Sequence, residues 1–210
     1  MSQTDRPHAV PATVRKEREM LEHNKIFNGL KREPFAWQFE QSAIFHKTLV
    51  SSEGEGTYTL VAAMNSGKTD AAGMNMLVAR SCFQIELFVF VSPSGLIKTQ
   101  VIDDFAFLGL NFSSGITNRR LIQQRLDPAL DGMSCTYQQV ARFPELFRKL
   151  TSQKPTMVVM DEVHHLASEL SWGDACKDAF EHSQIKMMMS GTPFRCDGNS
   201  IPFVRYEEDV

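Results

Sequence analysis

The sequence contains no run of 18 or more consecutive apolar residues, so it predicts no membrane-spanning helix and no membrane partner. Its first residues lack the apolar segment of a secretory signal, and we expect no such leader. The four cysteines are far apart and form no CxxC pair, which argues against a zinc knuckle and favours free thiols. We therefore expect a cytoplasmic protein, with a bacterial or phage origin as a working assumption.

The chain also lacks an excess of basic residues. Its 210 residues carry 22 lysines and arginines against 25 aspartates and glutamates, a formal net charge of −3. The total charge therefore gives no sign of a nucleic-acid partner, although a basic groove on one face is compatible with it. No internal repeat or low-complexity tract is present, and the length suits one domain with an added arm.

Residues 1–30 are mostly polar and predict an N-terminal arm outside the main core, with a helix that stops near Gly29. From residue 31 to 210, short apolar runs alternate with stretches of helical spacing such as 68–82 and 95–109. The expected strands cover 57–63, 85–92, 111–116, 132–137, 155–162, 184–191 and 201–206. This alternation predicts an α/β fold, a mostly parallel sheet with helices on both faces.

Polar clusters follow four of the expected strands, and they read NSGKT, SPS, DEVHH and SGT. In parallel sheets, ligands bind beyond the carboxyl ends of the strands. Because all four clusters fall at such ends, we expect them to meet in one site.

Residues 62–69 read AAMNSGKT, a turn of small residues between an expected strand and an expected helix. A phosphate loop needs this order, because backbone N–H groups at the helix start face the anion. We expect the backbone of residues 65–68 to surround the β-phosphate, Lys68 to reach the β- and γ-phosphates, and the Thr69 hydroxyl to ligate Mg²⁺. Ala62 stands where the pattern GxxxxGK[ST] has glycine, so a plain helix start with a solvated Lys68 is the alternative.

Asp161 and Glu162 follow the apolar run MVVM. Phosphoryl transfer needs one acid to hold Mg²⁺, and Asp161 suits this role. It needs a second acid to orient or deprotonate water, and Glu162 suits that one. A solvated strand end is the alternative. His164 and His165 are adjacent and do not have the spacing of HExxH, which argues against zinc.

Taken together, these motifs resemble the superfamily 2 helicases, the DEAD/DEXH-box group. DEVH resembles their motif II and AAMNSGKT their motif I, which commonly begins with alanine; Asn65 replaces a frequent glycine. The other motifs are PFAWQFEQSAI (34–44, adenine reading), FVSPSGLIKTQ (90–100, motif Ia), CTYQQVA (135–141) and SGTPFR (190–195, motif III). The similarity is greatest to helicases and translocases related to restriction-enzyme motor subunits.

The resemblance implies a three-layer RecA-like P-loop domain with four groups of site residues. The nucleotide-binding group is Phe35, Trp37, Gln38, Met64, Asn65, Ser66, Gly67, Lys68 and Thr69. The catalytic group is Lys68, Asp161, Glu162 and His164, with Thr69 and Asp161 as the Mg²⁺ ligands. The nucleic-acid contacts are Ser92, Ser94, Lys98, Thr136 and Tyr137, and the coupling residues are Ser190 and Thr192.

The implied activity is ATP-dependent DNA translocation or unwinding with ATP and Mg²⁺, and the motifs favour DNA over RNA. Such helicases use two RecA-like domains, and residues 31–210 match the first one. We therefore expect a second domain in cis or in trans, with weak Mg-ATP binding, slow hydrolysis and no unwinding by this chain alone. One alternative is a non-catalytic module that binds nucleic acid or a partner. A kinase or GTPase fits less well, because an arginine-rich lid and an NKxD motif are missing from the sequence.

Overall fold

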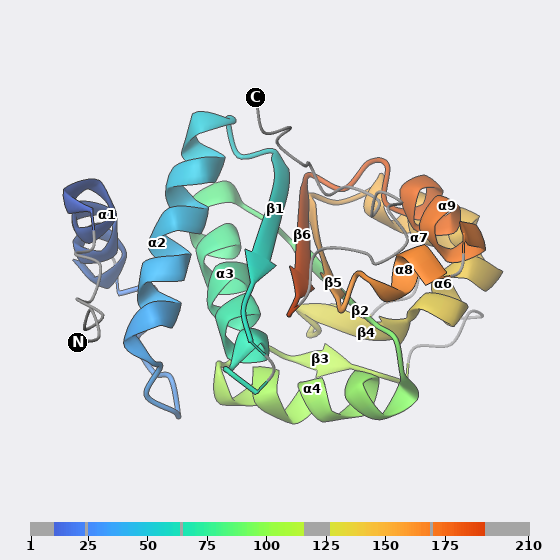
Figure 1. Cartoon of the computed structure of the whole chain (residues 1–210), viewed down its shortest axis with the longest axis horizontal. Helices are drawn as coiled ribbons and strands as arrows, with labels where there is room; N and C mark the ends of the chain where they lie inside the picture. The colour runs from blue at the N-terminus through green and yellow to red at the C-terminus, as the bar shows by residue number, and fades with distance from the viewer. Residues whose placement is uncertain (1–10, 24, 64, 116–126, 169, 192–210) are drawn as a thin grey trace, which may run out of the picture.

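The structure is a computed structural model that describes residues 11–23, 25–63, 65–115, 127–168 and 170–191. Its centre is a parallel sheet whose 6 described strands have the order β1-β6-β5-β2-β4-β3 (Figure 1). The strands are β1 Gly56–Val61, β2 Leu87–Ser92, β3 Phe112–Ser113, β4 Gly132–Thr136, β5 Thr156–Asp161 and β6 Ile185–Ser190. Because the strands are parallel, their carboxyl ends lie along one edge of the sheet.

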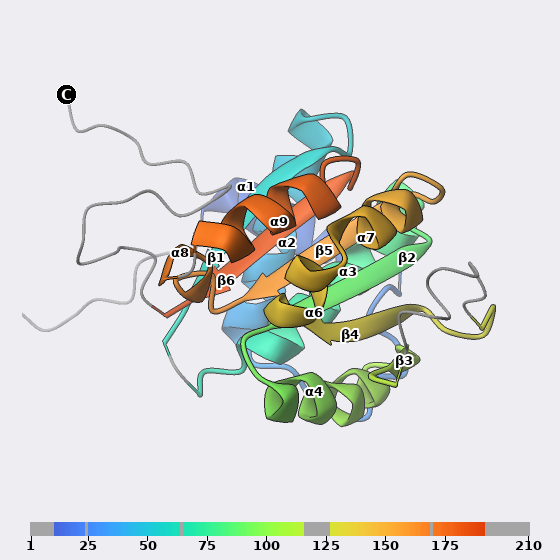
Figure 2. The ribbon, with the colours of Figure 1, turned by 90° about the vertical axis from the view of Figure 1, so that its right-hand side faces the viewer.

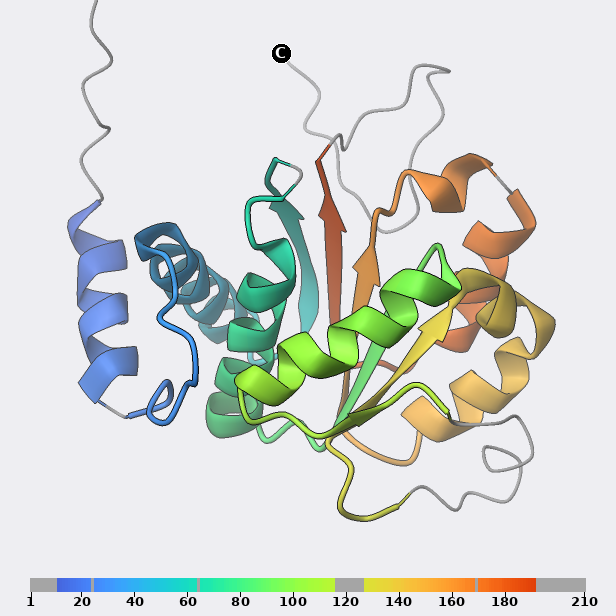
Figure 3. The ribbon, with the colours of Figure 1, turned by 90° about the horizontal axis from the view of Figure 1, so that it is seen from below.

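Helices cover both faces of the sheet. The helices α1 to α4, blue to green in Figure 3, lie on one side, and Figure 2 looks onto the side covered by α6 to α9. The first group is α1 Ala12–His23, α2 Ala36–Ser51, α3 Lys68–Phe83 and α4 Gly95–Phe107. The second group is α6 Tyr137–Arg142, α7 Pro144–Thr151, α8 His165–Ser168 and α9 Leu170–Ala179. None of the helices in the described ranges is long and apolar enough to cross a membrane.

The buried strands have apolar side chains on both faces, as expected for a sheet between two helical layers. In β2, Phe88 and Phe90 join the core under α1 to α4, while Val89 and Val91 join the core under α6 to α9. All six residues of β2 and of β5 are buried. This arrangement confirms the predicted α/β fold with three layers, and the expected strand at 201–206 lies outside the described residues.

The N-terminal segment differs from its prediction in one respect. Helix α1 packs against α2, and its Leu21 is fully buried in the same core as the sheet. Glu17 of α1 also pairs with His46 of α2 at 2.9 Å. The described part of residues 1–30 is therefore attached to the core and does not lie outside it, while the domain boundary near residue 30 stays a prediction.

Candidate functional site

The phosphate-loop and acidic clusters meet at the carboxyl edge of the sheet, around a cavity of about 420 Å³. Lys68 begins α3, directly after the loop that follows β1, and Asp161 ends β5 two strands away. The cavity is lined by Arg32, Asn65, Gly67, Lys68, Thr69, Asp70, Ile97, Gln100, Val101, Asp104, Asp161 and Glu162. Lys68 and Asp161, which the sequence prediction assigns to one site, both line this cavity.

The phosphate loop owes its shape to two residues in the left-handed backbone region. Gly67 has a φ of 87° and Asn65 a φ of 59°. Asparagine tolerates this conformation better than most residues with a side chain, which explains how Asn65 replaces glycine in the motif. The Ser66 hydroxyl donates to the Ala63 carbonyl at 2.7 Å and closes the turn.

Gln38 connects α2 to the phosphate loop. Its amide nitrogen donates to the Gly67 carbonyl at 2.9 Å, and its amide oxygen accepts from the Phe35 N–H at 2.8 Å. Phe35 is 62% exposed beside this loop, whereas Trp37 packs partly against the core. In this structure the Gln38 side chain hydrogen-bonds to the phosphate loop and holds it against α2. Its contact with adenine stays a prediction.

Replacing Gly67 by alanine is expected to destabilise the domain by at least about 1 kcal/mol, measured by urea unfolding. The new Cβ would need a left-handed backbone and would lie 2.7 Å from the Gln38 amide nitrogen. Gly95→Ala is the matched control, because a Cβ at Gly95 meets nothing within 4 Å and Gly95 has no positive φ. Equal stability of the two variants would contradict the role given to Gly67.

An ion pair joins the two halves of the site. The Lys68 ammonium lies 2.9 Å from Glu162 Oε1. Burial raises the pKa of Glu162, but the hydrogen bond and charge of Lys68, helped by His164, outweigh it and hold this pKa below its usual value. Glu162 is therefore ionised at neutral pH, and its ion pair engages the Lys68 ammonium that a bound phosphate would need.

Asp161 has the opposite electrostatic situation. Burial and repulsion from Glu162 raise its pKa to about 6, although Lys68 lowers it in part. A carboxylate of this kind lacks sufficient positive charge around it, and a divalent cation would supply that charge. Glu162 itself has a φ of 48°, a strained backbone of the type that collects at functional sites.

His164 and Ser190 form the outer part of the same network. His164 Nδ1 lies 3.1 Å from the Ser190 hydroxyl and 3.3 Å from Glu162 Oε2. The pKa of His164 is below its usual value because of burial and of neighbouring His165. Ser190 also donates to Glu162 Oε2 at 3.5 Å, so the predicted coupling serine touches the acidic pair.

The donor set around the cavity fits Mg²⁺. A buried carboxylate at Asp161 and a hydroxyl at Thr69 are hard oxygen donors. No group of three or more His, Cys, Asp or Glu in the described part of the chain has the geometry to hold a metal by itself. The chemistry therefore suits an ion that is shared with a bound phosphate group, which is the usual way in which Mg²⁺ is held at such sites.

The five predicted nucleic-acid contacts divide into two groups. Ser94 and Thr136 are partly exposed and cap α4 and α6, and Lys98 approaches Gln139 at 3.5 Å. Ser92 and Tyr137 are fully buried. Ser92 donates to the Ser94 carbonyl, and the Tyr137 ring lies in the core under α6 to α9, so direct contact of these two side chains with a strand is wrong for this structure. Two further predicted residues, Met64 and Thr192, lie outside the described residues.

Four polar or charged residues of the cavity were absent from the sequence prediction: Arg32, Asp70, Gln100 and Asp104. Arg32 pairs with Asp70 at 3.1 Å and lies over the Phe107 ring at 5.0 Å. Asp70, two residues after Lys68, was available as a signal because it lies in the first turn of the same helix. No sequence signal marks Arg32, since its place depends on how α4 crosses α3.

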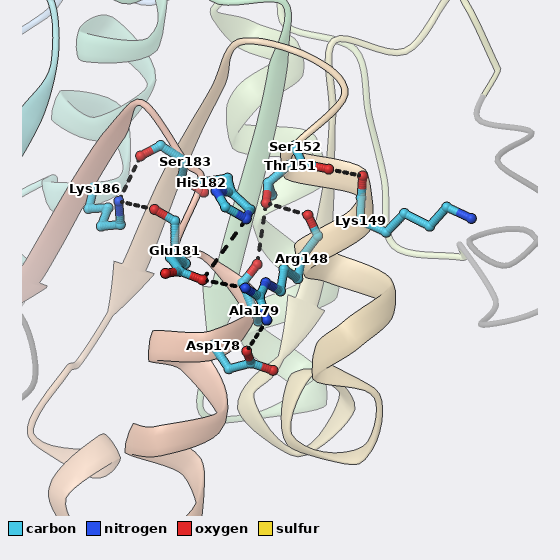
Figure 4. Close-up of polar contacts among 10 residues, drawn as sticks. All are labelled: Arg148, Lys149, Thr151, Ser152, Asp178, Ala179, Glu181, His182, Ser183 and Lys186. Carbon is cyan, nitrogen blue, oxygen red and sulfur yellow. Dashed lines mark hydrogen bonds and ion pairs between the residues drawn. The ribbon is translucent and has the colours of Figure 1, made fainter.

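A larger cavity of about 690 Å³ opens at the opposite edge of the sheet. Its charged groups mostly hold the surrounding loops together (Figure 4). Lys186 donates to the carbonyls of Glu181 and Ser183 at 3.3 and 2.7 Å. Glu181 also pairs with Arg148 of α7, which lies beside the cavity and pairs with Asp178 of α9 as well. This cavity brings together none of the predicted site residues, so the smaller one is the candidate site.

Residues 20–195 match the family described as Type III restriction enzyme, res subunit. An uncharacterized protein of Mycobacterium leprae is 31% identical over 217 residues, which cover 100% of this chain and 34% of that protein. One from Mycobacterium tuberculosis is 34% identical over 153 residues, 73% of this chain and 25% of its own length. The chain therefore spans about a third or less of these curated relatives.

Solved structures share the fold at low identity. The Sulfolobus solfataricus SWI2/SNF2 ATPase core in complex with dsDNA aligns with a TM-score of 0.61 and 18% identity, over 79% of this chain and 33% of that one. The Type ISP restriction-modification enzyme LlaGI, as a nuclease-deletion mutant with a DNA substrate mimic, gives 0.57 and 14%, over 77% and 18%. The Saccharomyces cerevisiae dbp5 complex with nup159, gle1, ip6 and ADP gives 0.53 and 17%, over 90% and 48%. At such identities the likeness shows the shared fold alone.

Proposed function

The chain belongs to the family of the type III restriction enzyme res subunit, with the RecA-like fold of superfamily 2 motor domains, and we propose that it is the ATP-binding domain of an ATP-dependent DNA helicase or translocase. The single observation that carries this proposal is the meeting of Lys68 with Asp161 and Glu162 around one cavity. A lysine for phosphate oxygens, an acid for Mg²⁺ and an acid for water are the parts that ATP hydrolysis requires.

In this proposal each residue has a role that its surroundings support. The N–H groups at the start of α3 and the Lys68 ammonium hold the phosphates of ATP, and Gln38 keeps the loop in shape. Thr69 and Asp161 hold Mg²⁺, which when bound neutralises charge on the β- and γ-phosphates. Glu162, ionised by its low pKa, orients and deprotonates the attacking water. His164 and Ser190 steady the Glu162 carboxylate through their contacts at its Oε2.

Binding of ATP must displace the ion pair between Lys68 and Glu162 in this proposal. The phosphates compete for the ammonium, and once it is released Glu162 is free to accept a proton. The nucleotide-free domain is thus held in a resting arrangement, which suits an enzyme that hydrolyses slowly until a partner domain closes on it.

DNA, a second RecA-like domain and a cytoplasmic bacterial setting are further parts of the proposal. The partly exposed Ser94, Lys98 and Thr136 lie at the same edge as the cavity and suit contacts with a strand's backbone. The second domain, in cis or in trans, would complete the nucleotide site, and the greater length of the mycobacterial relatives supports its presence in the same polypeptide. A non-catalytic binding module is disfavoured, because it has no need for the strained Glu162 or the poorly compensated Asp161.

Lys68→Ala is expected to weaken Mg-ATP binding by at least about 10-fold, because it removes a charge-assisted contact with the phosphates. Isothermal titration calorimetry on the 210-residue chain measures this. Lys47→Ala is the matched control, since Lys47 is exposed on α2. If both variants bind Mg-ATP as the unmodified chain does, or if the unmodified chain binds none, the proposed function is wrong.

A further inference from the structure

Tyr137 is a buried tyrosine at the junction of β4 and α6. Its hydroxyl donates to the backbone carbonyl of Asp161 at 2.7 Å. Its ring stacks against Trp172 of α9, with centroids 6.1 Å apart and planes at 22°. Tyr137 therefore reaches from the end of β4 past β2, which lies between them, to the end of β5.

The carbonyl that receives this hydrogen bond belongs to the peptide between the two acids of the site. Pairing of β5 with β2 ends at Met160, so on the β2 side Asp161 lies beyond the last strand partner. The next residue, Glu162, takes the left-handed φ of 48° that turns the chain toward Lys68. On the β6 side Asp161 is still paired with Met189, so the Tyr137 hydroxyl holds the peptide between the two acids from the other side.

The chemistry of this hydroxyl makes it a permanent donor. Burial is the main reason that the pKa of Tyr137 lies well above its usual value, and the nearby Cys176, Asp161, Cys135 and Glu162 raise it further. A tyrosine hydroxyl is a donor at neutral pH, so the geometry of this contact is that of a phenol donating to a carbonyl. Without this donor the Asp161 carbonyl would lose its contact on the β2 side, and only its strand pairing with Met189 of β6 would still hold the peptide.

We propose that Tyr137 is a positioning residue for the Asp161–Glu162 pair and the physical link between that pair and the β4–α6 junction. Thr136, the neighbouring residue, pairs with Ser92 at the end of the sheet and is partly exposed where a nucleic-acid strand is expected to bind. A displacement of this junction moves the donor that holds the Asp161 carbonyl. This inference rests on the proposed function, because it assigns a part of the same hydrolytic site.

Tyr137→Phe tests the link, because it removes the hydroxyl and keeps the ring on Trp172. The chain is supplied with its second RecA-like domain, in cis or in trans, and ATP hydrolysis is measured with saturating DNA. We expect kcat to fall by about 10- to 100-fold, as for a small misplacement of catalytic groups, and KM for ATP to stay within about 2-fold.

Tyr58→Phe is the matched control. Tyr58, in β1 of the same sheet, is also buried, and its hydroxyl accepts a hydrogen bond from the Gln41 amide of α2, away from the acids. The two variants are compared well below the lower of their unfolding midpoints, so that both are folded. An equal kcat for Tyr137→Phe and Tyr58→Phe overturns the proposal.

A double variant separates positioning from general loosening of the fold. If Tyr137 acts through the acidic pair, adding Tyr137→Phe to Glu162→Gln lowers kcat by a smaller factor than it does in the unmodified protein, because part of that loss has already occurred; a merely structural loss multiplies in full. Multiplying effects overturn the inference and leave the proposed function intact. If the unmodified protein shows no DNA-stimulated hydrolysis, the proposed function fails, and this inference fails with it.

Discussion

Glu162→Gln is expected to lower DNA-stimulated ATP hydrolysis by about 10²- to 10⁴-fold, the usual contribution of a positioned general base. Glutamine keeps the size of the side chain and its ability to hydrogen-bond, but it accepts no proton at neutral pH. The strained backbone at residue 162 and the contacts from His164 and Ser190 are retained. The loss therefore reports the chemistry of the carboxylate. Steady-state hydrolysis with saturating DNA and a second RecA-like domain measures it.

Binding of Mg-ATP should change in the opposite direction. The Lys68 ammonium lies 2.9 Å from Glu162 in the nucleotide-free protein, and a neutral glutamine holds it less strongly. We expect Glu162→Gln to bind Mg-ATP at least as tightly as the unmodified chain, in contrast to Lys68→Ala. Glu145→Gln, on the exposed first turn of α7, is the control and should change neither property. Hydrolysis within a few-fold of normal in Glu162→Gln would remove Glu162 from the catalytic role.

The fold and the centre of the site were predictable because both are local in the sequence. A strand buried on both faces must be apolar throughout, so residues 155–162 and 184–191 are recognisable without knowledge of their neighbours. The phosphate loop is a continuous segment, and the acidic pair ends one strand. Since parallel strands end along one edge, topology alone brings Lys68 and Asp161 together.

The errors concern side chains whose direction depends on other elements. Tyr137 was predicted to contact nucleic acid because the helicase resemblance implied that role for the motif CTYQQVA, which contains it. Its ring points into the core under α6 to α9, where it stacks on Trp172 of α9. Ser92 is buried for a similar reason, at the end of a strand enclosed on both faces. The direction in which a side chain at the end of a strand points depends on the helices that pack there, and the local sequence does not determine it.

Docking of α1 had a weak signal that was overlooked. Val14 and Leu21 are seven residues apart, two helical turns, and they are the buried side chains of an otherwise charged helix. The surrounding lysines, arginines and glutamates gave the segment the composition of an arm. A narrow apolar stripe is enough to attach such a helix when a neighbouring helix such as α2 presents an apolar face.

Asp161→Asn is expected to abolish hydrolysis and, at the same time, to stabilise the nucleotide-free domain by about 1–3 kcal/mol at pH 7.5. Burial and the neighbouring Glu162 raise the pKa of Asp161 to about 6 in the native protein, from an ordinary value of 3.8. A difference of about two pH units corresponds to about 3 kcal/mol between the two protonation states. Because the native pKa is raised, the penalty is absent below about pH 3.8, grows as the pH rises from there toward 6, and is complete above 6. Asparagine resembles the neutral acid and never carries this penalty.

Urea unfolding at pH 5 and at pH 7.5 measures the effect. The gain in the free energy of unfolding should be largest at pH 7.5, and about half of it should remain at pH 5, where the native carboxyl is mostly protonated. Asp174→Asn is the control, because the Asp174 side chain is 81% exposed and surface changes of this kind stay within about 0.5 kcal/mol. Equal stability of Asp161→Asn and the unmodified chain at both pH values would mean that Asp161 carries no uncompensated charge. The argument for a cation beside it would then be lost, and phosphate binding by Lys68 would have to be judged without it.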